Sequence, residues 1–159
     1  MLFRSLGSPA KLDLLSHPRQ SPTQARFSPS ERWITFVMHL ESGRSRVYIA
    51  PFRAQPSPPA EWIPVTDGKS WDTAPQWSPD GKVIYYTSNR DGSRCIWTQR
   101  LDASSHPAGE PSPVYHFHSA RRSPTLVPLN AVDMFVARDQ ILLSLGEISG
   151  NIWLGEVSE

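Results

Sequence analysis

Two histidines separated by one residue are the side chains in this sequence best placed for metal chemistry. His116 and His118 stand in the segment VYHFHSARR. If that segment is a strand, residues i and i+2 point to the same face, and neutral imidazole nitrogens are common metal ligands. A metal site needs a third ligand, which the sequence does not identify. The alternative is a pair of solvent-facing histidines on an outer strand. Because no third ligand is identified, we adopt this alternative and predict no metal site and no cofactor.

The other reactive side chains form no recognisable catalytic pattern. Cys95 is the only cysteine, so no internal disulfide can form, and its apolar surroundings predict a buried, inert thiol. The nucleophile-elbow pattern G-x-S-x-G, the zinc-protease pattern H-E-x-x-H and the phosphate-binding loop pattern are all absent. We therefore predict that the chain is not an enzyme.

Composition narrows the class of protein further. A chain of 159 residues suits one domain, and 16 basic against 15 acidic residues leave a net charge of +1. Such a balance gives no overall attraction to nucleic acid or to an anionic membrane, and we expect neither as a partner. The first 15 residues lack the apolar run of a signal peptide, and no run is long enough to span a membrane. The absence of these segments is what a cytoplasmic chain would show, but it does not determine the localisation, which we leave as unknown.

An internal repeat gives the strongest structural signal. Phe27–Pro29 aligns with Trp77–Pro79 at an offset of 50 residues (27 to 77), and a fainter third copy covers 140–157. Each copy has two strand-like segments joined through a turn. A period near fifty is typical of propeller blades, in which each repeat is one small antiparallel sheet.

The turns and strands of the second copy have clear physical signatures. Pro79 presets φ for a turn and Gly81 supplies positive φ, whereas the first copy has Glu31 at the position of Gly81. In the following strand, Ile84 and Tyr86 should point to one face and Tyr85 to the other. Apolar residues on both faces are expected of a strand that lies between neighbouring sheets.

The second copy, WSPDGKVIYYTSNRDGSRCIWTQRLD, resembles the repeat of TolB-like β-propellers, also called WD40-like (WD-repeat-like) propellers. The first copy keeps Phe-Ser-Pro, and the third keeps Gly-Asn-Ile-Trp at 150–153. The chain as a whole is also similar to the C-terminal part of longer bacterial sensor-type proteins. The resemblance implies an all-β chain of about three four-stranded antiparallel blades, an incomplete propeller.

The resemblance also sets the expected organisation of the chain. It implies an N-terminal tail over 1–9 and a partial propeller over 10–157, with repeats at about 10–53, 61–102 and 113–157. In this phase, outer strands fall at 11–16, 61–66 and 113–118. The inner strands fall at 24–53, 74–102 and 131–157.

Three blades do not close a ring, because complete propellers have four to eight. We expect two blade faces to be exposed and apolar, and such faces usually mark interfaces. A homodimer of two three-bladed chains would complete a six-bladed ring. The alternative is that the chain is a fragment of a longer propeller.

The loops on one side of the blades gather charged residues and an aromatic anchor. Loops that lead into the first strand of each blade emerge beside the turns between its second and third strands. We predict a binding surface there, suited to a protein, a peptide or a small anionic ligand. Its predicted binding residues are Arg19, Trp71, Asp72, Arg90, Arg121 and Arg122. The alternative is a solvated rim of mixed charge.

These observations favour a non-enzymatic binding module that completes a ring by self-association. The alternative function is an accessory propeller of a peptidase or kinase whose catalytic domain lies on another chain or was lost.

Overall fold

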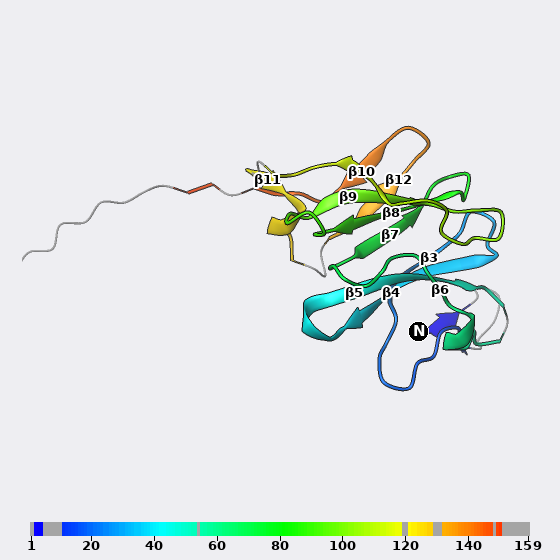
Figure 1. The fold of residues 1–159 in the computed structure, drawn as a ribbon. Coiled ribbons are helices and arrows are strands. Elements are labelled where there is room, and N and C mark those ends of the chain that lie inside the picture. The colour runs from blue at the N-terminus through cyan, green and yellow to red at the C-terminus, as the bar shows by residue number, and fades with distance from the viewer. Residues whose placement is uncertain are drawn as a thin grey trace, which may run out of the picture.

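The computed structural model describes residues 2–4, 11–53, 55–118, 121–128, 132–147 and 149–150. Within these ranges the chain is all-β, and its helical segments are three short 3-10 turns: η1 (Glu41–Gly43), η2 (Pro59–Glu61) and η3 (Pro124–Leu126). Two four-stranded antiparallel sheets form the body of the molecule and stack on each other (Figure 1). None of the helices in the described ranges has the length and apolar character needed to cross a bilayer.

The first sheet runs β3-β4-β5-β6, with consecutive strands as neighbours. Its strands are β3 (Thr23–Phe27), β4 (Trp33–Leu40), β5 (Arg44–Pro51) and β6 (Ile63–Pro64). The second sheet repeats this order as β7-β8-β9-β10. Its strands are β7 (Thr73–Trp77), β8 (Val83–Ser88), β9 (Cys95–Arg100) and β10 (Ser112–Tyr115). Each sheet thus takes three closely spaced strands from one predicted inner segment and its fourth from the next predicted outer strand, an arrangement consistent with a propeller-like fold.

The repeat is visible in backbone detail. The hydroxyl of Ser28 accepts a hydrogen bond from the N–H of Trp33 at 3.1 Å, and the hydroxyl of Ser78 accepts one from Val83 at 2.9 Å. Both first strands shift register against their neighbour, between Thr23 and Arg26 in β3 and between Thr73 and Gln76 in β7. The two sheets are therefore copies of one unit in both their turns and their irregularities.

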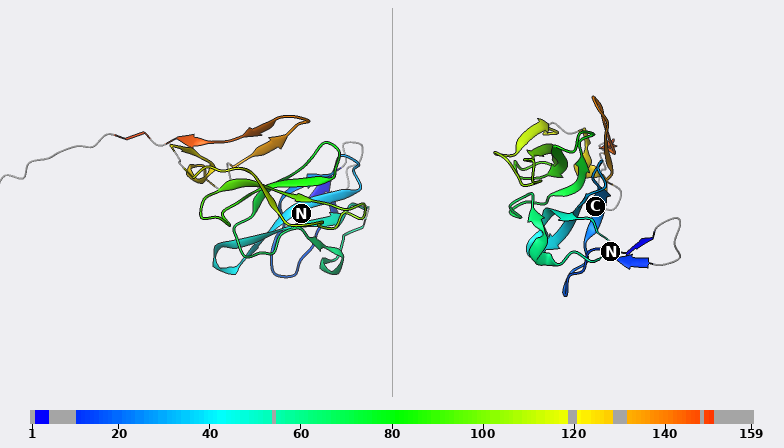
Figure 2. Two further views of the ribbon diagram at one scale, coloured as in Figure 1. Left: turned by 45° about the horizontal axis from the view of Figure 1, so that its top comes forward. Right: turned by 90° about the vertical axis from the view of Figure 1, so that its right-hand side faces the viewer.

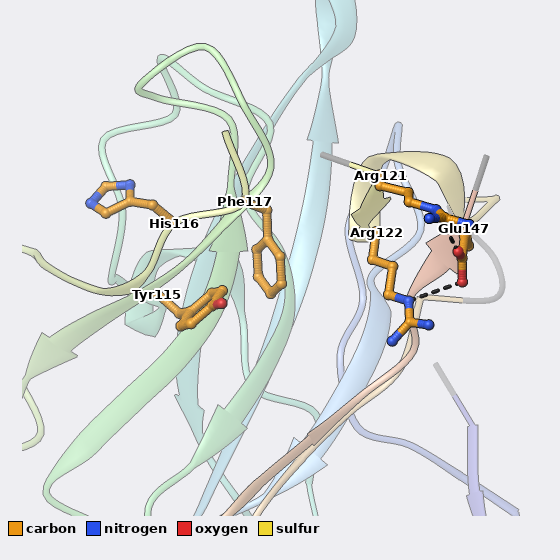
Figure 3. Close-up of a pocket in the computed structure, with 6 residues that line it drawn as sticks. All are labelled: Tyr115, His116, Phe117, Arg121, Arg122 and Glu147. Carbon is orange, nitrogen blue, oxygen red and sulfur yellow. Dashed lines mark hydrogen bonds and ion pairs between the residues drawn. The ribbon is translucent and has the colours of Figure 1, made fainter. Parts of the chain in front are cut away.

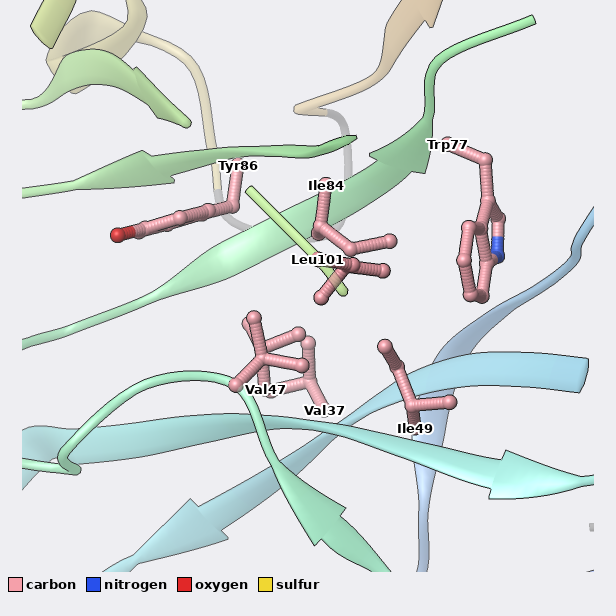
Figure 4. Packing of buried hydrophobic residues seen from close by; sticks show 8 residues of the cluster. Val37, Val47, Ile49, Trp77, Ile84, Tyr86 and Leu101 are labelled. Carbon is pink, nitrogen blue, oxygen red and sulfur yellow. The ribbon is translucent and has the colours of Figure 1, made fainter. Parts of the chain in front are cut away.

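The core between the two sheets uses the faces that the sequence pattern predicted. Ile84 and Tyr86 point from β8 toward the first sheet, where they meet Val37, Val47 and Ile49 (Figure 4). All five side chains are fully buried. The opposite face of β8 carries Tyr85, which packs in a separate cluster. Large apolar residues occupy both faces of β8 because the second sheet packs against the first sheet on one side and against further residues on the other.

That second cluster lies between the second sheet and a two-stranded sheet of β12 (Met134–Val136) and β13 (Ile141–Leu143). Figure 2 shows these two strands, in orange, crossing the side of the second sheet that faces away from the first sheet. Met134 and Val136 point inward and are buried, whereas Phe135 and Leu142 are directly paired and 64% and 74% exposed. The outward face of this sheet is therefore apolar and uncovered by the described residues.

The other end of the stack is closed, in contrast to the expectation of two exposed faces. Ile34, Phe36 and Met38 on the outer face of the first sheet are buried under Leu14, Leu15 and Trp62. Trp62 donates its ring N–H to the carbonyl of Ser57, and Leu15 forms a β-bridge with the same residue. The segment before β3 and the turn before β6 together supply the cover.

The third unit differs from the two complete sheets. β14 (Gly146–Glu147) pairs with β11 (Arg122–Ser123) instead of extending β13, so the predicted 131–157 sheet is split within the described residues. The predicted strand around Ile152 and Trp153 lies outside the described residues. The expected tail over 1–9 contains a strand, β1 (Leu2–Arg4), which pairs with β2 (Lys11–Asp13). Blade count and domain boundaries remain predictions.

Candidate functional site

Loops from successive units meet on one side of the stack. The hydroxyl of Ser45, at the start of β5, donates to the carbonyl of Asp72, and the side-chain oxygen of Asn89 accepts from the N–H of Trp71. Arg94, in the next turn, donates to the carbonyl of Pro124 in the third unit at 2.8 Å. The structure therefore joins the loops that the sequence analysis grouped, and it does so largely through backbone groups.

Trp71, which was expected to be exposed, is half-buried in this loop surface. Its ring tilts against His39, with centroids 5.4 Å apart. It lines a hollow of about 280 Å³ with Gly43, Asn89, Arg94 and other loop residues. Residues from three units border this hollow, which is smaller than the pocket beside Arg121 and Arg122.

Asp72 and Arg90 form an internal ion pair. Asp72 is fully buried, and its carboxylate lies 3.6 Å from the Arg90 guanidinium. Burial raises the pKa of Asp72, and the nearby Ser88 and Thr66 hydroxyls and Arg90 oppose that effect without outweighing it. Arg90 also stacks over the ring of Trp97 at 4.9 Å. These contacts pair the charges of both predicted residues with each other, and only the Arg90 side chain, which is 20% exposed, reaches solvent.

Arg121 and Arg122 form the exposed cationic part of the surface. Their guanidinium groups bind the same carboxylate, that of Glu147, at 2.8 and 2.9 Å. The two side chains remain 77% and 70% exposed. Pairing of β11 with β14 places these three residues together, since Arg122 lies directly opposite Glu147. Two cations share one anion, which leaves a local excess of one positive charge.

A pocket of about 410 Å³ opens beside this group (Figure 3). Tyr115 and Phe117 line its other side, with ring centroids 4.6 Å apart. In Figure 3 the two rings lie between the arginines and His116, whose ring is on the far side of them. The pocket thus combines an aromatic wall with a cationic wall, an arrangement suited to a ligand with both an apolar part and an acidic group.

Arg19 stands apart from this pocket. It is exposed in the loop between β2 and β3, where its backbone N–H donates to the His17 ring nitrogen. Arg19 lines neither of the two hollows described above. Of the six predicted binding residues, the structure places Arg121 and Arg122 in one pocket and Trp71 in another. Asp72 lies beneath the surface, and Arg90 is only partly exposed above it.

Sequence reasoning missed the two aromatic residues of the pocket, although the signal was present. Tyr115 and Phe117 alternate with His116 and His118 along the chain, so the aromatic rings and the imidazoles leave on opposite sides. His116 also lines this pocket, with its ring on the far side of the two aromatic rings. The rings of both histidines lie within 2.9 Å of one carboxylate oxygen of Asp91, which the sequence did not identify as a partner.

Comparisons with known proteins give little further information. No protein-family model matches the chain. An uncharacterized protein of Agrobacterium fabrum, Atu1656, is 44% identical over 41 residues, which are 26% of this chain and 14% of that protein. A solved structure named as a TolB candidate from Agrobacterium tumefaciens aligns with 89% of this chain and 66% of its own, at 16% identity and a TM-score of 0.36. That score is too low to support an argument about function.

Proposed function

We propose that this chain is a non-enzymatic, propeller-like binding module that takes an acidic peptide in the pocket between Tyr115, Phe117, Arg121 and Arg122. The observation that carries the proposal is the shared carboxylate of Glu147. One anion holds two exposed guanidinium groups side by side, so both are oriented before a ligand arrives. Pre-orientation lowers the entropy cost of binding.

The chemistry of the pocket favours a peptide over a bare anion. A carboxylate can take a bidentate contact from either arginine, while an aromatic side chain beside it can pack on Tyr115 and Phe117. Arginine and tyrosine are also residue types that dominate binding energy in protein interfaces. The same repeat-based organisation, with loops joined across units, provides a rigid support for such a pocket.

Fluorescence anisotropy with a labelled peptide of alternating glutamate and phenylalanine tests the proposal. We expect saturable binding that weakens with salt and falls at least about tenfold in Arg121→Ala/Arg122→Ala, since each charge-assisted hydrogen bond contributes about 1.5–3 kcal/mol. Arg100→Ala/Arg138→Ala is the matched control, because it removes two exposed arginines away from the pocket. Equal affinity of both double variants for the peptide would refute the proposed site.

We also propose that the chain associates with a second copy through the exposed face of β12 and β13. Phe135 and Leu142 form an apolar cross-strand pair on that face, and the described residues leave it uncovered. Because Leu14, Leu15 and Trp62 cover the opposite end of the stack, the contact favoured here joins two like faces. Light scattering should give a dimer mass for the natural chain and a monomer mass for Phe135→Lys/Leu142→Ser; a monomer for both would exclude this contact.

A further inference from the structure

Four side chains with metal-binding atoms converge beside the turn between β8 and β9. Asp91 lies in that turn, Cys95 begins β9, and His116 and His118 follow the end of β10. One ligand atom from each residue lies within 4.8 Å of the other three. The cluster borders the arginine pocket, because His116 lines that pocket as well, but the His116 ring points away from Arg121 and Arg122 (Figure 3).

The fold explains why residues so far apart in sequence meet. The turn after β8 carries Asp91 to the beginning of β9, four residues before Cys95. β10 pairs antiparallel with β9, with Tyr115 opposite Ile96, so the chain leaves β10 beside Cys95. The alternation after Tyr115 then turns both imidazoles, but neither aromatic ring, toward the turn.

The distances among the ligand atoms of Asp91, His116 and His118 approach those of a tetrahedral metal site, and the Cys95 sulfur lies within 4.8 Å of all three. Ligand bonds of about 2.0–2.1 Å to nitrogen or oxygen and about 2.3 Å to sulfur place neighbouring donors about 3.3–3.6 Å apart. The Nδ1 atom of His116 and the Nε2 atom of His118 are 3.3 Å apart. Their distances to the Asp91 carboxylate oxygen are 2.8 and 2.9 Å, so these contacts need to lengthen by only a few tenths of an ångström.

We propose that Asp91, Cys95, His116 and His118 bind one Zn²⁺ ion. A thiolate and two imidazoles select Zn²⁺ over the hard cations Ca²⁺ and Mg²⁺, which prefer all-oxygen sites. The anionic carboxylate and thiolate balance the charge of the ion, which suits a site where Cys95 is fully buried. Four protein ligands leave no open position, so the site is structural.

Neighbouring groups hold the ligands in place. The backbone N–H of Phe117 donates to the Sγ atom of Cys95 at 3.4 Å, an interaction that stabilises a metal-bound thiolate. The N–H of Ser93 approaches the other carboxylate oxygen of Asp91 at 3.5 Å. The ring of Trp97 meets His116 edge to face, with centroids 6.0 Å apart. Each of three ligands thus has an orienting contact outside the cluster.

The ion would fasten the outermost strand of the second sheet. All four residues of β10 are exposed, and its pairing with β9 is interrupted by an irregularity between Pro113 and Tyr115. A strand with so little buried surface has weak packing of its own. Coordination by residues of the turn, of β9 and of the segment after β10 links three elements at the point where that strand ends.

Cobalt substitution tests the site in the full-length chain. The reduced, chelator-treated protein is titrated with Co²⁺, then with Zn²⁺ as competitor. We expect one Co²⁺ per chain, with intense visible bands of tetrahedral coordination and a thiolate-to-cobalt charge-transfer band, all abolished by Zn²⁺. Cys95→Ser should lose the charge-transfer band. His118→Gln and Asp91→Asn should weaken binding at least about 100-fold.

His106→Asn is the matched control, because it removes an exposed histidine outside the cluster and should bind Co²⁺ like the natural chain. His118 is half exposed, so His118→Gln tests the site even where replacement of buried Cys95 prevents folding. The proposal is overturned if the natural chain gives no thiolate-to-cobalt band, or if His118→Gln binds Co²⁺ as tightly as His106→Asn.

Discussion

Glu31 and Gly81 occupy the same position in the corresponding turns of two repeats, with φ angles of +55° and +72°. In both turns the N–H of this residue donates to the carbonyl of the preceding serine, Ser28 or Ser78, at 2.9 Å. The repeat therefore requires a left-handed backbone at this position, and only the second copy has the residue that adopts it without strain.

Exchange of these residues should alter stability in opposite directions. Glu31→Gly is expected to raise the free energy of unfolding by about 0.5–1 kcal/mol, because relief of left-handed strain exceeds the added freedom of the unfolded chain. Gly81→Ala should lower it by about 1 kcal/mol. A new Cβ at Gly81 would meet only Pro29 at 3.8 Å, so the effect is conformational. Urea denaturation measures both; a stability loss in Glu31→Gly contradicts this account.

The first strands of the two sheets are linked by the side chain of Gln24, whose oxygen accepts the N–H of buried Ala74 at 2.8 Å. Gln24→Met keeps the shape but removes the acceptor, and it should lower the free energy of unfolding by about 1–3 kcal/mol. Gln24→Glu retains an acceptor and serves as the control. Chemical denaturation of the three proteins measures these free energies of unfolding. Equal decreases in both variants would show that the hydrogen bond does not contribute to stability.

Ile84 lies at the centre of the contact between the two sheets and is fully buried. Ile84→Ala should cost about 2–5 kcal/mol through lost burial and the cavity left behind. Val114→Ala, on exposed β10, should change the free energy of unfolding by less than about 0.5 kcal/mol. Similar, small losses in both variants would show that the sheets do not pack as described.

The raised pKa of buried Asp72 should make the free energy of unfolding depend on pH. Its folded pKa is raised above the ordinary value of 3.8, so the folded chain holds the proton more tightly than the unfolded chain. The free energy of unfolding contributed by Asp72 therefore falls as the pH rises from about 3.8 to the folded pKa, and is constant above it. Asp72→Asn removes this decline.

The comparison must use the difference between the natural chain and Asp72→Asn, because the lowered pKa of Asp80 and Asp102 acts in the opposite direction. Urea denaturation across this pH window should show the free-energy difference between the two proteins changing with pH. A difference that stays constant would mean that burial does not perturb this carboxyl group.

The sequence predicted the sheets well because their signals are local. Alternation placed Ile84 and Tyr86 on one face, and Pro79 and Gly81 marked the turn before them. These features depend only on neighbours within a few residues, and the structure confirms the all-β class and the four-stranded sheets that they predicted. The split of the third unit was not predictable, because pairing of β11 with β14 depends on contacts between segments more than twenty residues apart.

The candidate sites show the same limit. Arg121 and Arg122 were recognisable as an exposed pair, but their common partner Glu147 depends on the register of two short strands. Asp72 stands in a polar loop, where an aspartate is usually exposed, yet the fold buries it completely. Cys95 was interpreted as inert because its strand is apolar. Its proximity to Asp91 emerges only once the turn and the neighbouring strand are in place.

The covered end of the stack has a consequence for assembly. The two ends of the described part of the chain differ. The first sheet is covered by Leu14, Leu15 and Trp62, whereas Phe135 and Leu142 are exposed on the third unit. Two molecules that meet through the same face bury the exposed apolar surface of both, so the assembly closes as a dimer. With the dimer contact proposed above, head-to-tail growth into fibres would first require Leu14, Leu15 and Trp62 to uncover the first sheet.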